Sequence, residues 1–197
     1  EPGRSLPGAT LVIRDGIIEA VGVRIGLPAD AQVIDMTGKI IYPGFIDMYS
    51  AYGLTDPTEN ESISRAHDNI QMRSFFRAAD AFRHNEKDAS QLRSQGFVMA
   101  HVVPQHGLIR GKGTIISLGN GPISALIVRQ EVSQVLSIDR SYRLGRGYPL
   151  SAMGAYSFIR QSFYDVQWYE QAHAVYSASP RNTPRPENNP ALAVLGL

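Results

Sequence analysis

Lys39-Ile-Ile-Tyr-Pro-Gly-Phe-Ile-Asp-Met-Tyr-Ser-Ala51 is the stretch that decides the fold of this 197-residue chain. It predicts a short hydrophobic strand, a turn at Pro43-Gly44 and a second strand that runs toward a candidate site. Side chains alternate between the two faces of a strand, so Tyr49 and Ala51 are expected to point the same way where this strand ends.

The residues before this stretch predict a small sheet. Residues 9–23 hold two β-rich runs around Asp15-Gly16, which is a strong hairpin signal. Residues 31–35 and 39–42 form a second expected pair of strands around Thr37-Gly38. We therefore expect four short strands in this region, which is too few for a barrel.

The residues after it predict an α/β alternation. We expect a helix over 68–83, a second helix over 86–95 closed by Gly96, and a buried strand over 97–103. A turn and a strand follow over 107–118. Gly119-Asn-Gly121 then suggests a hairpin turn, with further strands over 125–128 and 131–138.

The last third of the chain is dominated by one long periodic stretch, residues 151–177, for which Ser151 is the expected N-cap. An apolar stripe is expected at Tyr156, Ile159, Phe163, Val166 and Tyr169. Core and edge packing is the simplest role for Tyr164, Trp168 and Tyr169.

The two ends of the chain suggest that it is part of a longer polypeptide. Residues 189–197 predict the start of an apolar helix, with Asn189 as N-cap and Pro190 at the first helical position. Its apolar residues look uncovered, which suggests a partner surface. The abrupt change of character over 54–65 also suggests that residues are missing there.

The composition excludes several function classes. Lys and Arg total 19 and Asp and Glu total 18, so the net charge of +1 gives no electrostatic case for nucleic acid or an anionic membrane. The absence of cysteine excludes disulfides, zinc–thiolate sites and thiol nucleophiles. No apolar run is long enough for a membrane span. The basic clusters over 140–146 and 181–185 are best interpreted as solvated loops.

Residues 9–53 carry a recognisable combination of motifs. Asp15-Gly-x-Ile-x-x-Val-Gly22, Val33-Ile-Asp-x-x-Gly-Lys39 and Tyr42-Pro-Gly-Phe-Ile-Asp47 occur in that order. Together they resemble the amidohydrolase superfamily of metal-dependent hydrolases, with imidazolonepropionase and dihydroorotase as examples. Residues 92–118 and 147–197 are also similar to a divergent, often extracytoplasmic branch of such proteins.

The resemblance implies an α/β fold, namely a partial TIM-like (β/α) barrel preceded by a small β-sandwich domain. The sandwich portion would be residues 1–42. The N-terminal part of the barrel would be 43–197, with an antiparallel insertion near 107–138. The branch it resembles favours an extracytoplasmic, periplasmic location over a cytoplasmic one.

The resemblance also implies a metal site that this chain does not complete. Members typically place His-x-His after the Pro-Gly-Phe-Ile-Asp segment, and this chain has Tyr49 and Ala51 there. Later strands of the family add a lysine or glutamate, two histidines and an aspartate, and these strands would lie beyond Leu197. We therefore expect these residues to assemble no metal site by the family pattern, and Tyr49 as a phenolate ligand is the less favoured alternative. Zinc or another divalent ion is expected to be possible in a complete protein.

Four side chains are candidates for the site. His101 ends an apolar strand and His106 follows it in a loop, so both are candidates for substrate binding. The alternative for His101 is a buried histidine that is hydrogen-bonded to the backbone. The alternative for His106 is a residue of a surface loop. Tyr49 is the third substrate-binding candidate, and Asp47 either orients the strand end or braces the Pro43-Gly44 turn.

A phosphate loop is the alternative for Arg110-Gly-Lys-Gly-Thr114. The pattern fails because Lys112 is followed by Gly113 rather than Ser or Thr, so a turn joining strands is the preferred interpretation.

Three functions stay open. The first is the N-terminal part of a hydrolase that acts on C–N bonds in small amide or peptide-like substrates. The second is a catalytically degenerate amidohydrolase-like binding or scaffold protein. The third is a subunit that needs the rest of its polypeptide, or a partner subunit, to cover its apolar end.

Overall fold

The computed structural model describes residues 5–55, 67–139 and 147–196. The chain divides into two compact units, residues 1–43 and 44–197. Most of the segment 54–65 and the basic cluster 140–146 lie outside the described residues, as do the first four residues and the last one.

The first unit holds one hairpin. Strands β1 (Thr10–Arg14) and β2 (Ile17–Gly22) pair antiparallel, with Arg14 opposite Ile17. The turn residues Asp15 and Gly16 have φ of 51° and 76°, the left-handed values that a two-residue turn of this kind requires. The predicted Asp-Gly hairpin is therefore confirmed.

The second predicted pair of strands in this unit is wrong. Residues 31–35 and 39–42 form no strand, although the turn between them is present. The Asp35 carboxylate accepts hydrogen bonds from the Thr37 backbone N–H and hydroxyl, and Gly38 has φ of 77°. Val33, Ile34, Ile40 and Ile41 are all exposed. A β-rich sequence does not become a ladder without strands to pair with, and the described part of this unit supplies no third strand.

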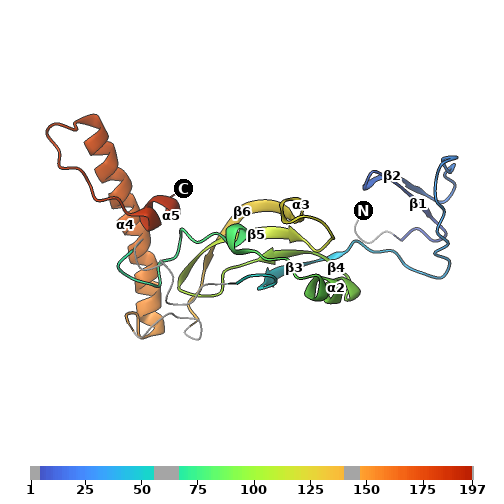
Figure 1. The fold of residues 1–197 in the computed structure, drawn as a ribbon, viewed down its shortest axis with the longest axis horizontal. Coiled ribbons are helices and arrows are strands. Elements are labelled where there is room, and N and C mark those ends of the chain that lie inside the picture. The colour runs from blue at the N-terminus through green and yellow to red at the C-terminus, as the bar shows by residue number, and fades with distance from the viewer. Residues whose placement is uncertain (1–4, 56–66, 140–146, 197) are drawn as a thin grey trace. The chain divides into compact units, whose positions relative to one another are not determined.

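The second unit is built on a four-stranded mixed sheet, β3-β4-β5-β6 (Figure 1). Strand β3 (Phe45–Ser50) runs parallel to β4 (Phe97–Val102). Strand β5 (Ile109–Ser117) is antiparallel to both β4 and β6 (Ile127–Leu136). The strand predicted after the Pro43-Gly44 turn is present, and so are the strands predicted over 97–103 and 107–118.

The described part of the crossover between the parallel strands β3 and β4 contains two helices. They are α1 (Ala78–Ala81) and α2 (Glu86–Ser94). The Asn85 side chain caps α2 by accepting from the backbone N–H of Lys87 and Asp88, and Gly96 follows its end with φ of 92°. Both helices contribute to a buried cluster with the central strands: Tyr52, Ala78, Phe82, Ala89, Ala100, Val102, Ile116, Leu118 and Leu126.

The predicted helix over 68–83 is reduced to the short α1. The residues before it lie beside β5 instead, through bridges that join Met72 to Ile109 and Arg77 to Lys112. The Arg73 backbone N–H donates to the Ile109 carbonyl at 2.7 Å. Hydrogen bonds to a neighbouring strand thus prevail over the helical spacing of the apolar residues in this segment.

The connection after β5 also differs from the prediction. A short helix, α3 (Ile123–Leu126), replaces the simple hairpin turn, and the two expected strands over 125–128 and 131–138 are the single strand β6. Gly121 has φ of 150°, so the glycine pair still marks the change of direction.

Helix α4 (Ala152–Ala178) confirms the predicted long helix and its Ser151 cap, whose hydroxyl accepts from the Gly154 N–H at 3.0 Å. Its buried residues are Ala155, Phe158, Ser162, Val166 and Tyr169. The predicted stripe is therefore partly wrong, because Tyr156 and Phe163 are exposed. Tyr164 and Trp168 are exposed too, so their predicted packing role is also wrong.

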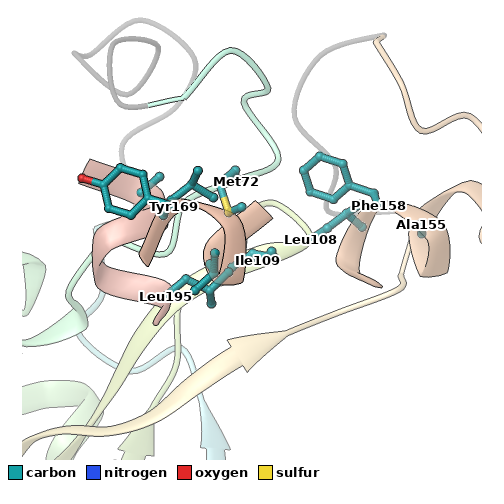
Figure 2. Packing of buried hydrophobic residues seen from close by; sticks show 10 residues of the cluster. Met72, Leu108, Ile109, Ala155, Phe158, Tyr169 and Leu195 are labelled. Atoms are coloured by element: carbon teal, nitrogen blue, oxygen red, sulfur yellow. The ribbon is translucent and has the colours of Figure 1, made fainter. Parts of the chain in front are cut away.

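Helix α5 (Pro190–Leu195) is capped by Asn189, as predicted, and packs against the rest of the chain. Figure 2 shows its cluster, in which Leu195 lies with residues of α4, Met72 and the start of β5. Ala191, Leu192 and Leu195 are buried there, so these residues do not supply the uncovered partner surface that the sequence suggested.

The fold class is confirmed as mixed α and β. The barrel and the sandwich stay predictions, because the described residues form an open four-stranded sheet and a separate hairpin. Among the described helices, none combines the length and the apolar character needed to cross a membrane.

Candidate functional site

The candidate site lies where the parallel strands β3 and β4 end. Tyr49 stands one residue before the end of β3, and His101 one residue before the end of β4. Parallel strands end at the same edge of a sheet, and loops at that edge are where α/β proteins bind ligands. Two of the candidates thus lie near the ends of neighbouring strands.

Tyr49 is held by an arginine that sequence reasoning missed. Arg110 Nη1 donates a hydrogen bond of 2.6 Å to the Tyr49 hydroxyl, while Arg110 Nε donates to the Gly107 carbonyl at 3.3 Å. Arg110 is 1% exposed and Tyr49 is 57% exposed. A buried guanidinium is costly unless its N–H groups are bonded, so the phenol oxygen contributes to keeping this charge in the fold.

This pairing fixes the direction of the phenol's own hydrogen bond. Because the guanidinium has only donors, the Tyr49 oxygen accepts from it and its O–H is free to donate elsewhere. A cation on the oxygen also draws electron density from it and makes the O–H a stronger donor. The strand end thus offers a hydrogen-bond donor that suits a carbonyl or carboxylate oxygen.

Asp47 acts on the backbone of the same strand. Its Oδ1 accepts from the Tyr49 N–H at 3.1 Å. The bond spans two residues and steadies the backbone from which the phenol projects. Of the two roles proposed for Asp47, this contact supports orienting the strand end.

His101 is bonded through both ring nitrogens. Nδ1 lies 3.2 Å from the Met48 carbonyl oxygen and Nε2 lies 2.9 Å from the Ser133 hydroxyl on β6. The imidazole therefore joins β3, β4 and β6. Ser133 carried no signal in the sequence, because nothing along the chain showed that β6 would bring it opposite Gly113.

The backbone of His106 takes part in holding the loop after β4. Its carbonyl accepts a hydrogen bond of 3.3 Å from Arg73 Nη1. Arg73 is itself buried, with its guanidinium over the Phe76 ring. The loop after β4 is therefore anchored to the segment that runs beside β5.

Arg110-Gly-Lys-Gly-Thr114 is not a turn. These residues lie inside β5, with Arg110, Gly111, Gly113 and Thr114 buried. The rejection of a phosphate loop stands, because the segment is a strand rather than a loop that opens a helix. In the sequence Arg110 directly follows the apolar pair Leu108-Ile109, but nothing along the chain identifies Tyr49 as its partner.

The residues at this strand end do not fit a metal ion. Tyr49 is bonded to a guanidinium, whose charge disfavours a cation beside it. Ala51 offers no ligand, and both nitrogens of His101 are engaged. Within residues 5–55, 67–139 and 147–196, no three His, Cys, Asp or Glu side chains gather in a way that would hold a metal.

No family model matches the sequence, and no curated protein matches it either. The structure is similar to the crystal structure of an amidohydrolase from Thermotoga maritima MSB8, with a TM-score of 0.65 and 23% identity. The match covers 93% of this chain and 49% of that chain, so this chain spans about half the length of that amidohydrolase. The likeness supports an amidohydrolase-like fold at a coarse level.

Proposed function

We propose that this chain is part of an amidohydrolase-like protein that acts on C–N bonds of small amide substrates. Its contribution is to bind the substrate, and the polarised Tyr49 hydroxyl is the group that carries this role. The observation behind the proposal is the 2.6 Å bond from Arg110 Nη1 to the Tyr49 oxygen at the end of β3. An amide carbonyl oxygen is the acceptor that such a donor fits.

The proposal gives the chain a binding role and no metal-ligating one. A divalent ion of the amidohydrolase kind would lower the pKa of a bound water. The described residues do not fit that ion, and their proposed contribution is to bind the substrate. The rest of the polypeptide or a partner subunit would have to supply the chemistry of hydrolysis.

The test is a panel of amides offered to the protein that carries this sequence: cyclic imides, N-acyl amino acids and dipeptides. Hydrolysis is followed by the release of free amine or carboxylate, and binding is followed by calorimetry. We expect one class of amide to bind. Tyr49→Phe is expected to weaken the binding affinity for that class by roughly tenfold, because it removes one hydrogen bond from a polarised donor. Tyr156→Phe is the control, because Tyr156 is exposed on α4.

The second candidate is a catalytically degenerate binding or scaffold protein. It is favoured by the same replacement of the expected histidine pair by Tyr49 and Ala51. Binding of an amide without release of product would select this candidate over the hydrolase. If none of the panel binds, and none is hydrolysed, the proposal of an amide ligand is wrong.

A further inference from the structure

Three strands of the sheet assemble a serine, a histidine and a backbone carbonyl in a row. Ser133 on β6 lies 2.9 Å from His101 Nε2 on β4, and His101 Nδ1 lies 3.2 Å from the Met48 carbonyl oxygen on β3. None of these contacts involves neighbours in sequence. The arrangement is therefore a product of the tertiary fold.

The Met48 carbonyl determines which ring nitrogen of His101 carries the hydrogen. A carbonyl oxygen only accepts, so in the neutral imidazole Nδ1 carries the hydrogen and Nε2 carries the lone pair. The Ser133 hydroxyl then donates to Nε2. This is the order found in activated nucleophiles: a hydroxyl, a base within hydrogen-bond reach and a third group that orients the base.

Gly113 lies on β5, the strand between β4 and β6, and leaves room for the contact between His101 and Ser133. A Cβ at this position would lie 2.5 Å from His101 Nε2 and 2.6 Å from Ser133 Oγ, both closer than real contacts allow. Gly113 is also paired directly with Ser133 in the β5–β6 ladder. Any side chain here would separate the hydroxyl from the imidazole.

The pair is open to reagents. His101 and Ser133 are each partly exposed, whereas the Ala100 and Val102 side chains beside His101 are buried. Partial exposure of both residues is the condition that reaction with a small acyl compound requires.

From this geometry we propose that Ser133 is a nucleophile activated by His101, and that it reacts with activated acyl compounds such as aryl esters. Ser133 Oγ attacks the acyl carbon, and its proton passes to His101 Nε2. That proton then goes to the departing aryloxide as the acyl–oxygen bond breaks. Water next attacks the acyl-serine, giving one proton to Nε2, which returns it to Oγ. The step stands on these contacts alone and does not rest on the proposed amide-binding function.

The first experiment uses a fluorophosphonate probe, whose phosphorus is attacked by activated serine hydroxyls with loss of fluoride. Peptide mass spectrometry of the labelled protein is expected to place the adduct on Ser133. Ser133→Ala removes the adduct, and His101→Gln slows labelling by about 100-fold, the usual contribution of a positioned base. The control is Ser117→Ala: Ser117 is a partly exposed serine of β5 whose hydroxyl accepts from the Gly119 N–H, so this variant labels like the parent.

The second experiment separates reactivity from folding. Circular dichroism and a thermal melt show whether each variant keeps its fold. In Ser133→Cys, we expect iodoacetamide to alkylate the thiol at least tenfold faster when His101 is present than when it is Gln, because the imidazole promotes the thiolate. An absent adduct on Ser133 in the parent protein overturns the proposal. Equal alkylation rates with and without His101 overturn it as well.

Discussion

Arg110 and Tyr49 form a donor–acceptor pair in which a guanidinium that is almost wholly buried meets a phenol that is mostly exposed, at 2.6 Å. The bond joins β5 to β3, two strands separated by β4 in the sheet. It places a positive charge at the strand end where the resemblance to amidohydrolases leads one to expect a metal ion.

The first prediction concerns the stability that this bond provides. Tyr49→Phe removes the acceptor and leaves a buried charged donor with one partner fewer, so we expect the free energy of unfolding to fall by about 1–3 kcal/mol. Urea denaturation measures it. Tyr156→Phe, at an exposed tyrosine, is expected to change the value by less than about 0.5 kcal/mol. Equal values for the two variants would show that the Tyr49 bond contributes nothing.

The second prediction concerns Gly113. Gly113→Ala places a methyl group against the His101 imidazole and the Ser133 hydroxyl, and overpacking of this kind costs about 1–3 kcal/mol. Thermal or urea unfolding measures the loss. The control is Gly26→Ala, because a Cβ at Gly26 meets no atom within 4 Å. A Gly113→Ala protein as stable as the control would mean that the imidazole does not occupy this space.

The sequence was informative where local chemistry decides the structure. Three kinds of local signal gave correct predictions: the Asp15-Gly16 hairpin turn, Gly96 after the end of α2, and the Ser151 and Asn189 caps. A glycine at positive φ and a capping oxygen at a helix start both act on nearby backbone. Their patterns can therefore be recognised in the sequence without the tertiary structure.

The predictions were wrong where contacts between residues distant in the sequence determine the structure. Residues 68–77 have helical spacing but are bonded to β5, and residues 31–35 have strand character but no partner strand among the described residues. In the candidate site, Tyr49 and His101 were chosen because the sequence places them near strand ends, and they lie one residue before the ends of β3 and β4. Arg110 and Ser133 were missed because their roles depend on which strands pair, and pairing across three strands leaves no mark in a single sequence.

The third prediction concerns pH. Burial raises the pKa of the Tyr52 phenol above its ordinary value, and its hydroxyl donates to the Asn85 carbonyl at 3.2 Å. Above about pH 10 the unfolded chain loses this proton while the folded chain keeps it. The stability contribution is therefore complete below that pH and is lost as the pH rises through the folded-state pKa.

Two measurements check this effect. The first is the difference in tyrosinate absorbance between the parent protein and Tyr52→Phe, which reports the ionisation of Tyr52. In the folded protein this difference is expected to develop at a higher pH than in protein unfolded by urea. The fall in unfolding free energy between about pH 9 and pH 11 is expected to be smaller in Tyr52→Phe than in the parent. A Tyr52 that titrates at the same pH in both states would contradict the prediction.

The fourth prediction concerns the docking of α5. Leu192 is 7% exposed in the cluster with α4 and Met72, so Leu192→Ala is expected to cost about 2–5 kcal/mol. Val175→Ala, at a position on α4 that is 57% exposed, is expected to change stability by no more than about 0.5 kcal/mol. Urea unfolding of both variants measures the difference. A neutral Leu192→Ala would mean that α5 does not pack on this chain in solution.

The central claim is that the end of β3 carries a phenol–guanidinium pair in place of a metal ligand. Calorimetric titration of Zn²⁺ into the protein and into its Tyr49→Phe variant tests it most directly. We predict that the two titrations are the same, whatever zinc binds elsewhere in the polypeptide. Stoichiometric zinc binding that weakens by tenfold or more in Tyr49→Phe would contradict the account.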